Sequence, residues 1–192
     1  MLRLAITGGL GSGKSTVSAL LRGRGVPVVD ADRLGHELLQ NEARDEVREQ
    51  FGTAEPAALA ELVFAPGAGA RLEQLNRILH ARIMAKAGEQ LRQWECAGKA
   101  MAGVEAALLI EAGLLAGFDR VVVVAAGAEL RVQRYLQRGG TRAQALARMA
   151  HQLPDAAKVE QADIVIDNNG PESALLPQVE RMLWQLGARE GA

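Results

Sequence analysis

The sequence lacks the features that mark secreted, membrane-bound or nucleic-acid-binding proteins. Its 192 residues include one cysteine, Cys96, so no disulfide can form within the chain, and we expect this thiol to be a small buried hydrophobic residue. The formal net charge of −1 gives no electrostatic reason to expect nucleic acid or a membrane surface as a partner. No apolar run approaches the ~20 residues that span a bilayer, and the apolar start is too short for a signal peptide. These absences predict a cytoplasmic protein.

A glycine-rich loop follows the first apolar run. The stretch "GGLGSGKST" fits the P-loop pattern G-x-x-x-x-G-K-[ST], with Gly8, Gly13, Lys14 and Ser15 at its defined positions. Glycines leave room for successive N–H groups to surround a phosphate, and the helix that starts near Lys14 adds the positive end of its dipole. Lys14 would then reach the β/γ-phosphates, and the Ser15 hydroxyl would bind Mg²⁺.

Alternating apolar and helical segments predict an α/β fold. Helical patterns separate the expected strands, so we predict a doubly wound, five-stranded parallel sheet of the P-loop kinase type, with ligands at the carboxyl ends of the strands. Pro27 cannot donate to a ladder, which places the second strand at a sheet edge. The length favours one domain over residues 1–192. The five expected strands are Leu2–Thr7, Val26–Asp30, Met101–Ala106, Arg120–Ala126 and Asp163–Asp167.

Two helical stretches are expected to cover the ligands. Residues from about 32 to 96 show no strand pattern and predict a helical insertion, broken near Gly52–Pro56 and Pro66–Gly69. A second helical stretch, Ala128 to about Glu160, is interrupted by Gly139–Gly140 and by a proline. Because adjacent glycines cost about 1 kcal/mol each in a helix, a hinge is expected there.

The hinge predicts a mobile lid over about residues 134–158. Arg134, Arg138 and Arg142 flank the two glycines and would swing over a bound nucleotide. An ordinary solvated helix face is the alternative interpretation of arginines at this spacing.

Two carboxylates follow the second strand. Asp30 and Asp32 stand on either side of Ala31, and in an extended segment their side chains would share one face. One would accept a proton from an acceptor hydroxyl while the other orders magnesium-bound water or a ribose hydroxyl. Asp32 can also cap the following helix. The carboxylate pair favours a small-molecule kinase, whereas the N-K-x-D motif of GTPases is absent.

These motifs and their order resemble the dephospho-coenzyme A kinase family. Ala81 and Ala107 stand where the family has proline, and an Asp-Arg pair expected near Pro56–Ala57 is missing. Besides the P-loop and "DAD", the matching blocks are "LAELVFA" (59–65), "RLEQLNRILHARI" (71–83), "ALLIE" (107–111) and "HQLPDAAKVEQADIVIDNNG" (151–170).

The resemblance implies a reaction and its residues. ATP would phosphorylate the ribose 3′-hydroxyl of dephospho-coenzyme A, the last step of coenzyme A biosynthesis, with Asp32 as general base, Asp30 in support and Lys14 neutralising the transferred group. The acceptor would lie across the insertion, where His80 contacts it and Glu111 closes the pocket or joins a polar network. Mg²⁺ would bind Ser15. The expected ATP-binding residues are Gly11, Ser12, Gly13, Lys14, Ser15, Thr16, Arg138, Arg142 and Asn168, the last near the adenine.

Other interpretations stay open at this point. Another small-molecule or nucleoside monophosphate kinase would share the same core, and a nucleotide-binding regulatory protein would keep the P-loop without catalysis. Retention of both aspartates argues against the regulatory protein, because a pure binder needs no carboxylate pair. His36 and His151 have no partners at metal-ligand spacing, so no zinc site is expected. ATP and dephospho-coenzyme A are the expected partners of a monomer or weak homo-oligomer.

Overall fold

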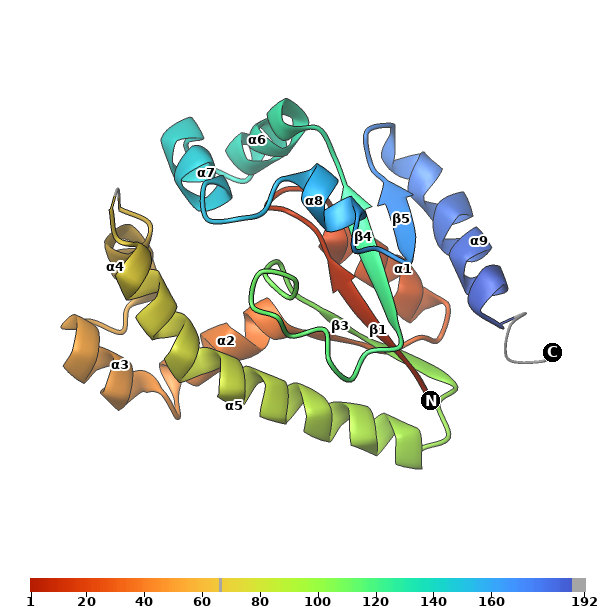
Figure 1. The fold of residues 1–192 in the computed structure, drawn as a ribbon, viewed down its shortest axis with the longest axis horizontal. Helices are drawn as coiled ribbons and strands as arrows, with labels where there is room; N and C mark the ends of the chain where they lie inside the picture. Colours follow the sequence, from red (N-terminus) through yellow and green to blue (C-terminus); the bar gives the residue numbers. More distant parts are fainter. Residues whose placement is uncertain (66, 188–192) are drawn as a thin grey trace.

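A parallel sheet forms the centre of the protein in the computed structural model, which describes residues 1–65 and 67–187 (Figure 1). Its strand order is β2-β3-β1-β4-β5, and every pairing is parallel, which confirms the predicted doubly wound α/β fold. Pro27 lies just before the edge strand β2 and contributes only its carbonyl, which accepts from Gly103 N at 2.9 Å. The strands are β1 (Leu2–Thr7), β2 (Val28–Asp30), β3 (Met101–Glu105), β4 (Arg120–Ala125) and β5 (Ile164–Asp167).

The core lies on both faces of the central strands β1 and β4. Helices α1 (Lys14–Gly23) and α9 (Leu175–Gly187) pack their apolar stripes against one face, beside Leu4 and Val122. The chain enters α9 through a short 3₁₀ turn, η1 (Glu172–Ala174), after Pro171. The other face is covered partly by the segment that follows β3, where Leu109 is buried. Because both faces of the sheet are covered, the sequences of these strands are nearly continuous apolar runs.

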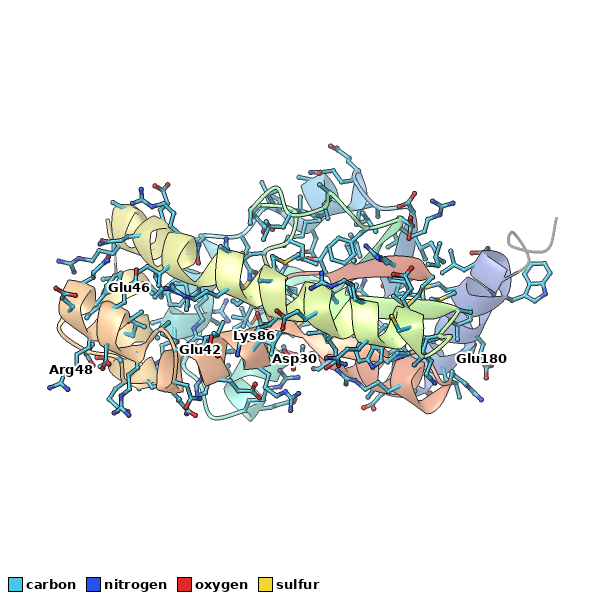
Figure 2. The ribbon with its side chains drawn as sticks, turned by 90° about the horizontal axis from the view of Figure 1, so that it is seen from below. Asp30, Glu42, Glu46, Arg48, Lys86 and Glu180 are labelled. Carbon is cyan, nitrogen blue, oxygen red and sulfur yellow. The ribbon has the colours of Figure 1, made fainter. Side chains whose placement is uncertain are left out.

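Four helices occupy the stretch between β2 and β3 and enclose a core of their own. Leu38, Val47, Leu59 and Leu75 are central members of this second cluster. Glu42, in the turn after α2 (Ala31–Gln40), forms an ion pair with Lys86 on α5 (Gly69–Cys96), the longest of the four helices (Figure 2). The four helices are α2 (Ala31–Gln40), α3 (Arg44–Phe51), α4 (Pro56–Val63) and α5 (Gly69–Cys96).

The predicted breaks in this helical stretch are confirmed between α3 and α4 and between α4 and α5, although Pro66 itself lies outside the described residues. A further break, which the sequence did not predict, separates α2 from α3 around Asn41. Ala81 lies inside α5, which runs through it without interruption. A proline there would remove a helix hydrogen bond and clash with the preceding turn.

Three short helices follow β4: α6 (Ala128–Gln137), α7 (Arg142–Met149) and α8 (Asp155–Val159). The break between α6 and α7 is at the predicted glycines. Gly139 has φ 85°, and a Cβ on Gly140 would lie 2.0 Å from the Tyr135 ring. Thr141 then caps α7 by accepting from Gln144 N. The glycines therefore make a tight turn that other residues could not enter without strain.

The surface of the protein differs from expectation at Cys96. Cys96 is exposed, so its expected burial is wrong. The reason is its position at the last residue of α5, beyond Leu91, the last buried side chain of that helix. Across residues 1–65 and 67–187, no helix has the length and apolarity that crossing a bilayer requires.

Candidate active site

The P-loop connects β1 to α1 in the predicted shape. Gly11 and Gly13 have φ angles of 72° and 99°, in the left-handed region that favours glycine. A Cβ on Gly13 would lie 2.1 Å from the Asn168 amide nitrogen, so close packing adds to the conformational demand. Asn168 is buried, and its Nδ2 donates to the Ser12 carbonyl at 2.7 Å. The loop is thus held against the residue that follows β5.

Lys14 places a buried cation beside this loop. Its side chain is 8% exposed, and Nζ donates to the Gly9 carbonyl at 3.3 Å. Burial lowers the pKa of Lys14, and the nearby carboxylates of Asp32 and Glu105 partly offset that effect. The charges of two acids therefore act on this ammonium.

Asp30 and Asp32 occupy different local structures. Asp30 is the N-cap of α2, where its Oδ1 accepts from Arg33 N at 2.9 Å, and the helix already includes Ala31 and Asp32. The expectation that an extended segment places both carboxylates on one face is therefore wrong, and the capping residue is Asp30 instead of Asp32. The reason is that capping by Asp30 starts the helix at the very next residue.

Asp32 does not cap the helix, and it lines a cavity between α2, α5 and the segment after β3. Asp32 is exposed at the mouth of this site, yet the surrounding protein still removes enough water to raise the pKa of Asp32. The Lys14 ammonium opposes this rise in the pKa of Asp32, and Asp30 adds to it. An acid whose pKa is raised by its surroundings and that faces a lysine is a candidate for proton transfer.

Glu105 is an acid that sequence reasoning missed. It ends β3, pairs in register with Asp30 on β2, and is 5% exposed. Burial raises the pKa of Glu105, with the Ser18 hydroxyl and Lys14 as partly opposing influences. Within the described residues its Oε2 has no hydrogen-bond partner. The available signal was its place at the carboxyl end of a predicted strand, where ligands of parallel sheets bind.

An apolar cavity of about 250 Å³ opens next to Asp32. It lies between α2, α5 and the segment after β3, and apolar side chains form most of its wall. His80 also lines it and faces an adjacent hollow that Glu111 borders. Burial lowers the pKa of His80, which favours its neutral form. The structure thus brings Asp32 and His80 to one cavity. Its apolar wall includes Leu39, Leu79, Ile83, Met84, Leu108, Leu109 and Leu114.

Glu111 belongs to a buried polar network. Its Oε1 lies 2.7 Å from Lys158 Nζ and accepts from Leu153 N at 2.9 Å. Lys158, which sequence reasoning also missed, is fully buried and donates to the Ala107 carbonyl at 2.9 Å. These contacts join the segment after β3 to α8.

The three arginines near the glycine turn lie in different surroundings. Arg134 donates to the carbonyls of Asn168 at 2.9 Å and of Gly11 at 3.4 Å, so it already contacts the P-loop. Arg138 is exposed at the end of α6, and Arg142 pairs with Glu129 at 2.8 Å on the surface. Among the described residues, neither Arg138 nor Arg142 forms a hydrogen bond with the P-loop.

A family model and the curated relatives agree on one family. Residues 2–173 match the family described as dephospho-CoA kinase. A dephospho-CoA kinase of Deinococcus radiodurans is 42% identical in an alignment that covers 96% of this chain and 92% of that protein. A crystal structure from Thermus thermophilus, 34% identical, matches with a TM-score of 0.80 over 98% of this chain and 97% of that one. Dephospho-CoA kinase from Campylobacter jejuni, 24% identical, has the same fold, with a TM-score of 0.68 over 98% of both chains.

Proposed function

The chain belongs to the dephospho-CoA kinase family and catalyses the last step of coenzyme A biosynthesis, and we propose that Asp32 is the general base of this reaction. Asp32 would take the proton of the ribose 3′-hydroxyl as that oxygen attacks the γ-phosphorus of ATP. One observation carries this assignment: Asp32 lines the apolar cavity, and the charge of Lys14 in the P-loop acts on its carboxyl and lowers its pKa. A group at that junction can touch the acceptor and the transferred group together.

The P-loop residues would bind ATP and stabilise its charge. The positive N-terminus of α1, which follows the P-loop glycines, suits an anion, and the phosphates would draw Lys14 from the Gly9 carbonyl. An ammonium beside the transferring group stabilises the charge that spreads over its oxygens. Asn168 supports this role by holding the loop at Ser12, while a contact between Asn168 and the adenine stays a prediction.

The residues around the P-loop fit Mg²⁺. Hard cations of this size take carboxylate and hydroxyl oxygens, often through water. Ser15 lies in the first turn of α1, and the buried Glu105 has an Oε2 without a partner among the described residues. Ser15 would hold the ion, with Glu105 and Asp30 orienting its water. A bound Mg²⁺ would neutralise phosphate charge during transfer.

The helices α2 to α5 would form the acceptor-binding insertion, at about residues 32–96. They supply one side of the cavity, which would hold an apolar part of dephospho-coenzyme A. His80, neutral because burial lowers its pKa, would donate to or accept from a polar group of the acceptor. Glu111 would support the adjoining wall through its pair with Lys158.

The segment of about residues 134–158 would act as a lid. Its α7 lies near α4 of the insertion (Figure 1). The Arg148 guanidinium on α7 lies 5.2 Å from the ring centroid of Phe64, at the end of α4. The glycine turn would let Arg138 and Arg142 move over ATP and exclude water. Arg142 would exchange Glu129 for phosphate in that step.

A panel of acceptors tests the proposed function. Purified protein is incubated with Mg²⁺ and ATP together with dephospho-coenzyme A, AMP, CMP, shikimate or gluconate, and ADP release is measured. We expect phosphorylation of dephospho-coenzyme A, at the 3′-hydroxyl, and background rates with the others. Equal or faster turnover of another acceptor would contradict the acceptor site. The Asp32→Asn variant, assayed in parallel, tests the base.

Three predictions about the wider setting stay predictions. They are a cytoplasmic location, a monomeric or weakly associating state, and the absence of nucleic acid or membrane partners. Fractionation of cells and light scattering of the purified protein test the first two.

A further inference from the structure

Leu10, in the middle of the P-loop, is held by side chains distant in the sequence. Its N–H donates to Gln152 Oε1 at 2.9 Å, and its carbonyl accepts from Arg131 Nε at 2.9 Å. Both polar groups of this residue are therefore engaged by protein. Leu10 is therefore a point at which side chains from α6 and from the turn after α7 hold the loop.

Arg131 is the centre of this attachment. It lies on α6, is 5% exposed, and its Nη1 is 2.5 Å from Asp155 Oδ1, while Nη2 donates to the same Gln152 oxygen at 3.3 Å. The other oxygen of Asp155 accepts from Ala126 N at 3.2 Å, just after β4. A guanidinium has five donors in a rigid fork, so one side chain can join these partners at once.

The approach of Arg131 also restricts the loop's sequence. A Cβ on Gly9 would lie 2.1 Å from Arg131 Nη2, and a Cβ on Gly11 would lie 2.5 Å from the Arg131 carbonyl oxygen. Neither position is among those that the P-loop pattern requires to be glycine. Space for the Arg131 guanidinium therefore explains Gly9, while Gly11 meets the backbone of α6 and also needs glycine for its φ of 72°.

We infer that Arg131 is a positioning residue, which holds the P-loop in its phosphate-binding shape through Leu10. The inference rests on the proposed ATP site. Gln152, between α7 and α8, and Asp155, the first residue of α8, complete the contacts, so the same cluster connects α6 and the start of α8 to the loop. A loop held in shape before binding loses less conformational freedom when ATP arrives, which strengthens affinity.

The Arg131→Lys variant tests this role, because lysine keeps a positive charge opposite Asp155 but cannot also donate in a fork to Leu10. We expect the Kd for ATP, measured by calorimetry, to rise about tenfold, the effect of one lost hydrogen bond from a charged group. The KM for dephospho-coenzyme A should change little. The matched control is Arg24→Lys, in an exposed pair with Glu180, which should leave ATP affinity unchanged.

Gln152→Ala is a second, milder variant. It removes the acceptor of Leu10 N, so ATP affinity should fall by a smaller factor and the Leu10 amide should exchange its hydrogen faster. Unchanged ATP affinity in Arg131→Lys, with only a lower melting temperature, would overturn the inference. If that variant does not fold, unchanged affinity in Gln152→Ala decides against it. A wild-type protein that fails to bind ATP would instead refute the proposed function.

Discussion

Glu111 and Lys158 form an ion pair, with 2.7 Å between Oε1 and Nζ, in which the lysine is fully buried. The pair links the segment after β3 to α8. Removing one partner from such a pair leaves a charge without compensation in a medium that solvates it poorly.

We therefore expect Lys158→Met to lower the free energy of unfolding by about 3–5 kcal/mol, as measured by urea denaturation. The double variant Glu111→Gln with Lys158→Met should recover part of that loss, because no buried charge is then left alone. Equal losses in the single and double variants would show that the packing of Lys158, and not its charge, is what matters.

Lys14→Ala should abolish almost all kinase activity while the protein stays folded, because the ammonium acts on phosphate charge. Losing one group that stabilises transition-state charge lowers kcat by up to about a thousandfold, so turnover should fall well below about a tenth of the wild-type value. The assay is ADP release, with circular dichroism to check folding. Lys99→Ala, an exposed change before β3, should behave as wild type. Turnover above about a tenth in Lys14→Ala would refute the P-loop assignment.

Asp32→Asn should lower kcat by about 10²–10⁴-fold with little effect on ATP affinity, since an amide keeps the shape but takes no proton. Asp30→Asn is the matched comparison, because asparagine caps a helix about as well as aspartate and α2 should be preserved. A greater loss of turnover in Asp30→Asn would show that the two carboxylates have exchanged roles. Unchanged turnover in both variants would contradict a general-base role for either aspartate.

The pH dependence of kcat/KM should also show that Asp32 acts as the base. A base is active when it is deprotonated. Burial raises the pKa of Asp32, so its carboxyl stays protonated to a higher pH than that of a free aspartate, whose pKa is about 3.9. Activity should therefore fall, as the pH is lowered, at a value above that reference. A flat profile down to about pH 4 would contradict Asp32 as the group that titrates.

Arg138→Ala should reduce turnover by about tenfold or more through lost charge stabilisation, with a modest change in the apparent affinity for dephospho-coenzyme A. Residues 134–158 should also resist limited proteolysis when ATP and the acceptor bind together. Arg24→Ala, at a distant exposed pair, serves as the control. Identical cleavage with and without both ligands would identify the segment as an ordinary surface helix pair.

Local features of the chain could be predicted from sequence because they depend on the backbone of a few neighbouring residues. Gly11 and Gly13 adopt the left-handed conformations that a P-loop requires, and Gly139 makes the turn that ends α6. Pro27 precedes an edge strand because it has no N–H for a ladder. Hydrophobic periodicity likewise identified the five strands to within a few residues.

The same local reasoning was wrong where two local outcomes competed. Asp30 and Asp32 are both able to cap a helix, and which one does so depends on where the strand β2 stops pairing with β3. Cys96 was expected to be buried from its residue type alone, yet its exposure depends on where α5 leaves the core.

The composition of the site was decided by the tertiary structure, because its contacts join residues far apart in the chain. The charges of Glu105 and Lys14 act on each other only because β3 lies beside β1, and Arg131 reaches Leu10 across 121 positions. The strand order and the packing of α6 and α8 bring these groups together. Periodicity and motifs describe each segment separately, so the sequence determined the P-loop and its flanking elements, while only the folded sheet decided which charges surround them.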